Sequence, residues 1–126
     1  MLHYATTGGA GRLTADELRA LEATFGEGIH EVIDGGRRLF IIPKVTLPAG
    51  CNPAAAFGIY HASAHGGYST RLFLEVPICK ADGMTPPTVT EVLCQRTMYA
   101  ASYNGVPADL PPHQGILAHL RLYEPA

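Results

Sequence analysis

The spacing of apolar side chains predicts a helix near the start of the chain. Leu18, Leu21 and Phe25 recur at intervals of three and four residues, so they share one face of a helix. Thr14 and Glu17 fit a capping box, in which the side chain of each residue bonds the backbone N–H of the other. These residues therefore predict a helix that begins directly after Thr14.

Four apolar runs follow, and each has the length and composition of a β-strand. They span residues 29–33, 37–42, 54–62 and 71–78. Asp-Gly-Gly between the first two runs suits a tight hairpin turn, because Asp and Gly tolerate the positive φ that such turns need. Short links between successive strands predict an antiparallel meander.

Alternation within these runs predicts which side chains face the core. In the first run Ile29 and Ile33 are expected to share one face, with Glu31 between them. In the fourth run Val76 is expected to face inward, and Arg71 outward.

The stretch from residue 88 to residue 103 fits two structures. Thr88 and Glu91 have the spacing of a second capping box, which indicates a helix. The same residues also alternate between polar and apolar, as in a strand. Both structures remain open on the sequence alone.

A second helix is predicted at the end of the chain, from about residue 113. Ile116, Leu120 and Tyr123 lie four and three residues apart, and so share one helical face. The order of elements predicts an α+β fold. Residues 13–126 are expected to form one domain behind a flexible tail, residues 1–12.

Composition narrows the class of protein. The chain has 126 residues, 47% apolar and 16% charged, which suits one compact domain. The net charge of −2 gives no electrostatic attraction to nucleic acid or to an anionic membrane. No apolar run reaches the roughly 20 residues of a membrane span. Three cysteines without a CxxC pair predict a cytoplasmic protein with reduced thiols.

Two short stretches resemble a bacterial group of ubiquitin-conjugating (UBC-like) proteins. The sequence LPAGCN at 47–52 resembles the "LPxG(Y/F)N" step of that group, and GGY at 66–68 resembles its "GYP" turn. Both stand directly before a predicted strand, and the resemblance extends over residues 14–123. It implies a single UBC-like domain with an N-terminal helix, a four-stranded antiparallel meander and a C-terminal helix.

The resemblance also implies an activity and two partner proteins. Members of such systems receive a ubiquitin-like modifier from an adenylating, activating enzyme, hold it as a cysteine thioester and transfer it to a lysine. No cofactor is needed on the carrier, since ATP is used by the activating enzyme. Bacterial sets of this kind resemble antiphage defence systems, so a role in defence is expected.

Cys94 is the first candidate for the nucleophile, because it follows the fourth strand and a loop, where the family places its cysteine. Gln95 and Asn104 are candidate donors to the oxyanion. Glu91 lies one turn away if this stretch is helical, and would orient the incoming lysine. Cys79, next to a lysine at the end of a strand, is the runner-up.

Two other functions stay open. The chain has no His-Pro-Asn motif and no Trp, features that accompany the family's cysteine, so a catalytically inactive UBC-like scaffold or interaction domain is an alternative. His61 and His65 have a spacing seen in metal sites, which suggests a small β-rich metal-binding enzyme as a second alternative. A histidine on an apolar strand face, like His61, is more typical of a hydrogen-bonded interior residue.

Overall fold

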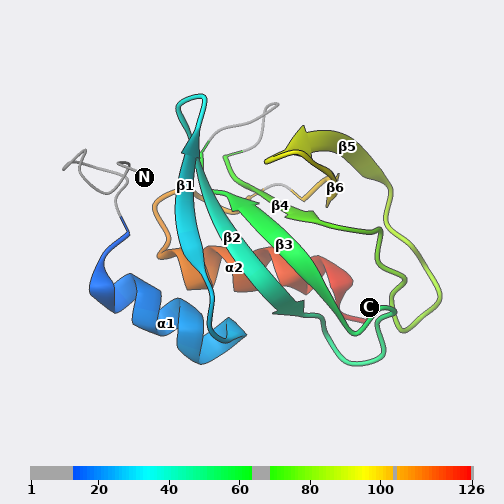
Figure 1. Ribbon diagram of the computed structural model, residues 1–126. Helices are drawn as coiled ribbons and strands as arrows, with labels where there is room; N and C mark the ends of the chain where they lie inside the picture. Colours follow the sequence, from blue (N-terminus) through cyan, green and yellow to red (C-terminus); the bar gives the residue numbers. More distant parts are fainter. Residues whose placement is uncertain (1–12, 64–68, 104, 126) are drawn as a thin grey trace.

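A computed structural model describes residues 13–63, 69–103 and 105–125 of the chain (Figure 1). The predicted flexible tail, residues 1–12, lies outside the described residues. In the described part, no helix is both long and apolar enough to cross a membrane.

The described chain contains two α-helices and six β-strands, which confirms the α+β class with a helix near each end. The elements are α1 (Ala15–Phe25), β1 (His30–Asp34), β2 (Arg37–Thr46), β3 (Ala55–His61), β4 (Arg71–Leu74), β5 (Thr88–Leu93), β6 (Arg96–Ala101), α2 (Pro112–Leu120) and the short 3-10 helix η2 (Arg121–Tyr123).

All six strands form one antiparallel sheet in the order β1-β2-β3-β4-β6-β5. The predicted sheet of four strands is therefore wrong in size. The two additional strands come from residues 88–103, where the sequence left helix and strand open. They form a hairpin that joins the sheet through β6, so the helix that Thr88 would have capped does not form.

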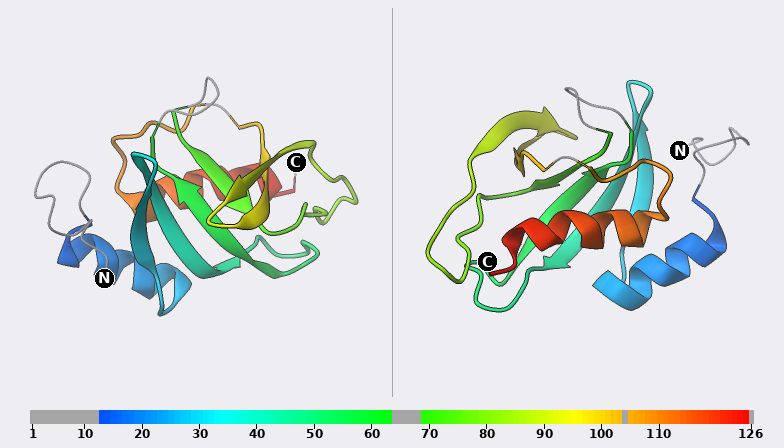
Figure 2. Two further views of the ribbon diagram at one scale, coloured as in Figure 1. Left: turned by 45° about the horizontal axis from the view of Figure 1, so that its top comes forward. Right: turned by 180° about the vertical axis from the view of Figure 1, so that it is seen from behind.

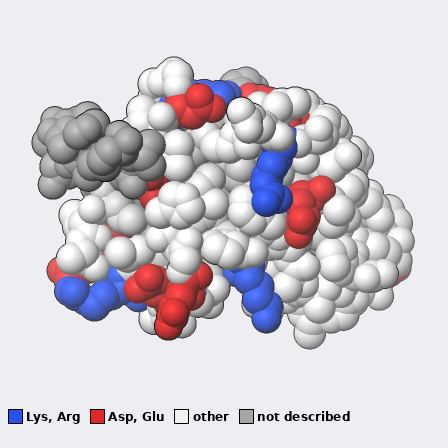
Figure 3. Space-filling model, viewed as in Figure 1, with Lys and Arg blue, Asp and Glu red and all other residues white. Residues whose placement is uncertain are grey.

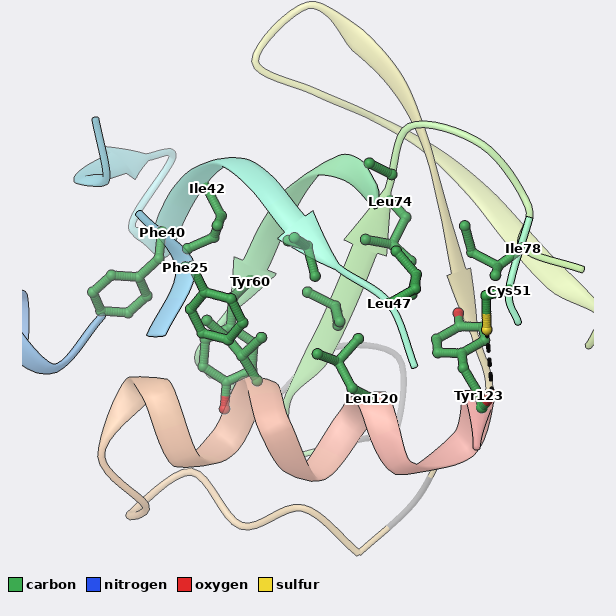
Figure 4. Packing of buried hydrophobic residues seen from close by; sticks show 14 of the residues in the cluster. Phe25, Phe40, Ile42, Leu47, Cys51, Tyr60, Leu74, Ile78, Leu120 and Tyr123 are labelled. Carbon is green, nitrogen blue, oxygen red and sulfur yellow. Dashed lines mark hydrogen bonds between the residues drawn. The ribbon is translucent and has the colours of Figure 1, made fainter. Parts of the chain in front are cut away.

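The sheet has apolar side chains on both faces. On one face α1 and α2 cover a cluster that includes Phe40, Tyr60 and Ile116 (Figures 2 and 4). On the other face Leu93 and Met98, both from the β5–β6 hairpin, belong to a second buried cluster. Because the hairpin covers this second face, the sheet is buried on both sides.

The capping box at the start of α1 is confirmed. Thr14 Oγ1 accepts a hydrogen bond from the N–H of Glu17 at 3.0 Å, and Glu17 Oε1 accepts one from the N–H of Thr14 at 3.0 Å. Leu21 and Phe25 are buried against the sheet. Local periodicity and capping chemistry were therefore sufficient to place this helix.

The face that Ile29, Glu31 and Ile33 share is covered unevenly, because cover is lost toward the turn that joins β1 to β2. Glu31 lies opposite Phe40 and is buried, whereas Ile33 lies opposite Arg38 beside the turn and is 43% exposed. Glu31 forms an ion pair with Arg38 and accepts a hydrogen bond from the N–H of Leu13 at 2.8 Å. These contacts satisfy the buried carboxylate of Glu31.

Two predictions for the fourth strand were also wrong. Arg71 is buried, because β4 lies in the middle of the sheet and all four of its residues are covered. Val76 lies beyond the last residue of β4 and is exposed. The strand is four residues shorter than the apolar run that predicted it, and alternation carries no information past its end.

Candidate functional site

The β5–β6 hairpin presents Cys94 at its turn. Leu93 pairs with Arg96, so Cys94 and Gln95 are the two central residues of the turn, and their φ angles are 51° and 66°. Two central residues with positive φ match a type I′ turn, a position usually filled by Asn or Gly. Cys94 and Gln95 are of neither type, so the turn that carries the Cys94 thiol is strained.

Cys94 lines an open depression between the first and the last hairpin of the sheet. Val32, Ile33 and Asp34 contribute one wall from β1, and Val92 contributes to the other from β5. Gln95 lines the same depression, so two of the predicted site residues, Cys94 and Gln95, do lie together. A thiol with a neighbouring amide donor has the groups required to form and stabilise an acyl intermediate.

The environment of Cys94 raises the pKa of its thiol. Partial burial in the hairpin is the largest cause, and the carboxylate of Asp34 adds to it. The guanidinium of Arg37 acts in the opposite direction but does not reverse the shift. The side chain is nevertheless exposed, so the thiol is accessible to reagents although it stays protonated at neutral pH.

Glu91 does not take the position predicted for it. The prediction required a helical turn between Glu91 and Cys94, and this stretch is a strand. In the structure Oε2 of Glu91 lies 2.9 Å from Nη1 of Arg37. The carboxylate is therefore committed to an ion pair, and the assignment of Glu91 as the group that orients a lysine loses its basis. Asn104, the second predicted oxyanion donor, lies outside the described residues.

The other two cysteines have structural contacts. Cys51 is buried, and its thiol donates to the carbonyl oxygen of Tyr123 at 3.4 Å (Figure 4). Burial raises the pKa of this thiol. Cys79 is partly buried, pairs with Asn52 through backbone hydrogen bonds of 2.8 and 2.9 Å, and its thiol lies 3.6 Å from the carbonyl oxygen of Lys80. Of the three thiols, Cys94 alone is exposed.

The two histidines proposed as metal ligands do not define a metal site. His61 is buried, and its Nδ1 lies 3.0 Å from the carbonyl oxygen of Ser63, as in a hydrogen-bonded interior histidine. His65 lies outside the described residues. No group of three or more histidine, cysteine or acidic side chains suited to a metal ion occurs in the part of the chain that the structure describes.

Sequence reasoning missed Asp34 and Arg37 as members of the site. Both appeared in the sequence only as flanks of a tight turn, far along the chain from Cys94. They reach the site because the sheet brings its first hairpin next to its last, as the ion pair between Arg37 and Glu91 shows. On the face seen in Figure 3, acidic and basic side chains likewise lie close together.

No protein-family model, curated protein sequence or solved structure matches this chain. The assignment of a function therefore depends on the geometry around Cys94 and on the sequence resemblance described above.

Proposed function

We propose that the chain is a UBC-like carrier, which holds a ubiquitin-like modifier as a thioester on Cys94 and transfers it to a lysine. The observation that supports this most is the position of Cys94, the one exposed thiol, on a tight turn in an open depression. An adenylating enzyme would supply the modifier, in the cytoplasm and within a bacterial set of the antiphage type. The motifs at 47–52 and 66–68 support that choice of acyl group.

The proposed reaction is two acyl transfers. In the first, the Cys94 thiol loses its proton and its sulfur attacks the thioester carbonyl of the modifier held by the activating enzyme. A new S–C bond forms, and the thiol of that enzyme leaves and takes up a proton. In the second, a lysine amine attacks the same carbonyl, an amide forms, and the Cys94 thiol is regenerated.

The raised pKa of Cys94 suits a carrier. A thiol that ionises reluctantly is a poor leaving group, so its thioester persists until an amine arrives. The carboxylate of Asp34 lines the same depression, and its negative charge disfavours the free thiolate. The side-chain amide of Gln95 can donate to the oxyanion formed at the carbonyl carbon.

A second candidate function is an interaction domain without catalysis. The same raised pKa supports it, since no preformed thiolate is present at neutral pH. Ile33 and Val92 support it too, because they are 43% and 63% exposed on the rim of the depression and offer apolar contact area to a partner. The two candidates differ in whether Cys94 accepts an acyl group.

The test uses ubiquitin that carries a C-terminal thioester of 2-mercaptoethanesulfonate, which removes the need for an activating enzyme. Intact mass spectrometry follows acylation of the wild type, Cys94→Ala, Cys94→Ser and Cys79→Ala. The carrier proposal expects an adduct on the wild type and Cys79→Ala that hydroxylamine removes, and no adduct on Cys94→Ala. Cys94→Ser is expected to give a slower, hydroxylamine-resistant ester.

Free lysine added to the wild-type adduct should release the ubiquitin as a lysine amide. If folded wild type forms no adduct, or if Cys94→Ala is acylated as readily as the wild type, the carrier proposal fails and the interaction domain takes its place.

A further inference from the structure

β5 lies at one end of the sheet order and forms one of its two edges (Figures 1 and 2). In a two-residue hairpin closed by Leu93 and Arg96, alternate residues of the strand bond to the partner strand. The remaining residues, Thr88, Thr90 and Val92, then turn their backbone N–H and C=O groups outward. Among the described residues, no loop or turn forms a backbone hydrogen bond with Thr88, Thr90 or Val92.

This edge lacks the features that protect most edge strands from pairing. Residues 88–93 contain no Pro and no Lys, and Val89 and Val92 are 44% and 63% exposed. Glu91 is the one charged residue of the strand, and Arg37 holds its carboxylate. A row of outward backbone donors and acceptors beside exposed valines fits an added strand of polypeptide, because an extended backbone matches every one of these groups.

The edge leads directly to the depression that contains Cys94. Val92 has the last outward-facing backbone groups of β5, and its side chain also lines that depression. A chain paired beside β5 advances by about 3.3 Å per residue, as β5 itself does. The residues that follow its contact with Val92 therefore come abreast of Cys94.

We propose that the free edge of β5 binds the extended C-terminal segment of the acyl donor as an added strand, parallel to β5. This inference rests on the proposed carrier function. The direction follows from the geometry, because β5 runs toward Cys94 and only a parallel chain brings its C-terminal carbonyl to the sulfur. An antiparallel chain would bring its amino end there. Mixed sheets with one strand of different direction at the edge are common.

The edge also defines the chemistry of the segment that it binds. Small or β-branched apolar side chains suit the positions beside Val89 and Val92. Acidic side chains are excluded near Glu91 and Asp34, which already carry negative charge. Proline is excluded wherever the segment donates its N–H to β5.

The probe is a peptide of sequence KVTVTA that carries a C-terminal thioester of 2-mercaptoethanesulfonate. Its reaction with Cys94 forms a new thioester and releases the small thiol with the cysteine proton. The acetyl thioester of the same thiol cannot pair with a strand and reports the reactivity of Cys94 alone. Rates of adduct formation at Cys94 are measured by peptide mass spectrometry.

Thr90→Pro is the informative variant, because the N–H of Thr90 points outward and its loss removes no bond to β6. The peptide thioester should acylate Thr90→Pro about tenfold more slowly than the wild type. The acetyl thioester should react equally with both proteins. Thr90→Ala, the matched control, keeps the N–H and should stay within about twofold of the wild type for both reagents.

A peptide methylated on the nitrogens that face β5 tests the same contact with the protein unchanged, and it should lose the rate advantage of the parent peptide. If the parent peptide reacts with wild type no faster than the acetyl thioester, strand addition is overturned while the carrier function stands.

If neither reagent acylates Cys94, the carrier function fails, and the unreactive peptide amide then tests the edge by NMR. Shifts confined to the amides of Thr88, Thr90 and Val92 would support the edge as a binding site, and their absence would overturn it.

Discussion

Nη1 of Arg37, at the start of β2, lies 2.9 Å from Oε2 of Glu91 in β5. The same guanidinium lies 3.0 Å from the carboxylate of Asp34, so one cation joins the first hairpin to the last. The side chains of Arg37 and Glu91 are 32% and 27% exposed, and water weakens such a pair to at most about 1 kcal/mol of stability. The larger effect of this arrangement is electrostatic, because it places the opposite charges of Asp34 and Arg37 near Cys94.

Asp34 and Arg37 should shift the reactivity of Cys94 in opposite directions. Asp34→Asn removes a negative charge that disfavours the thiolate, so the pKa of Cys94 should fall. Arg37→Gln removes the compensating positive charge, so the pKa should rise further. The pH dependence of iodoacetamide alkylation at Cys94 measures both shifts. Asp82→Asn, in the exposed loop beside Lys80, is the control and should leave the profile unchanged.

The close packing of α2 on the sheet should make Gly115 intolerant of any side chain. A Cβ at this position would lie 2.1 Å from the hydroxyl oxygen of Tyr60, which is buried in the core. Gly115→Ala should therefore lower the free energy of unfolding by about 1–3 kcal/mol, in spite of the better helix propensity of Ala. Chemical denaturation measures the loss, and Gln114→Ala on the exposed side of the same turn is the matched control.

The same contact can be tested from the side of the tyrosine. Tyr60→Phe removes the hydroxyl oxygen nearest the added Cβ, although the ring carbon behind it would still lie 2.8 Å away. Gly115→Ala should consequently cost less in the Tyr60→Phe background than in the wild type. Equal costs in both backgrounds would show that the hydroxyl contact is not the source of the destabilisation.

Stability should fall with decreasing pH because of a buried histidine. Nε2 of His119 lies 2.7 Å from Oγ1 of Thr70, and the ring packs edge-on against Tyr60. Burial, with a contribution from Arg71, lowers the pKa of His119 from 6.5 to about 4. The unfolded chain then binds the proton first, so stability is full above pH 6.5 and is lost as the pH falls from 6.5 toward 4.

Between pH 7 and pH 5 this histidine should cost about 2 kcal/mol in the free energy of unfolding. Denaturant titrations at the two pH values measure the difference. His119→Gln should be less stable than the wild type at pH 7 but should lose most of this pH dependence. His30→Gln, which alters an exposed histidine, should retain it. A His119→Gln protein with the full dependence would contradict the assignment.

The helices were predictable because the signals that define them are local. Thr14 and Glu17 cap α1, and Ile116 and Leu120 mark the buried side of α2 within a few residues of sequence. The stretch after Thr88 satisfied a capping box and a strand pattern equally. The choice between them was made by the burial of Leu93 against the far side of the sheet, a contact that no local pattern contains.

The site was only partly predictable for a related reason. Cys94 and Gln95 were identified from residue type and position. The turn that carries them contains neither Asn nor Gly, so the sequence lacks the usual signal of a hairpin there. Asp34 and Arg37 join them through an arrangement of strands that brings together residues 54 positions apart, such as Arg37 and Glu91. Such a pairing depends on the sheet as a whole, and a single sequence does not display it.

The most direct test of the central claim, that Cys94 is the accessible thiol of this protein, is competitive alkylation of the folded chain at pH 7.5 with limiting iodoacetamide. Peptide mass spectrometry compares Cys94, Cys79 and Cys51 with the same residues in the unfolded chain. Cys94 should be modified first, although more slowly than when unfolded because its pKa is raised, and Cys51 should be protected by its burial. Protection of Cys94, or faster modification of Cys79 or Cys51, would contradict the account.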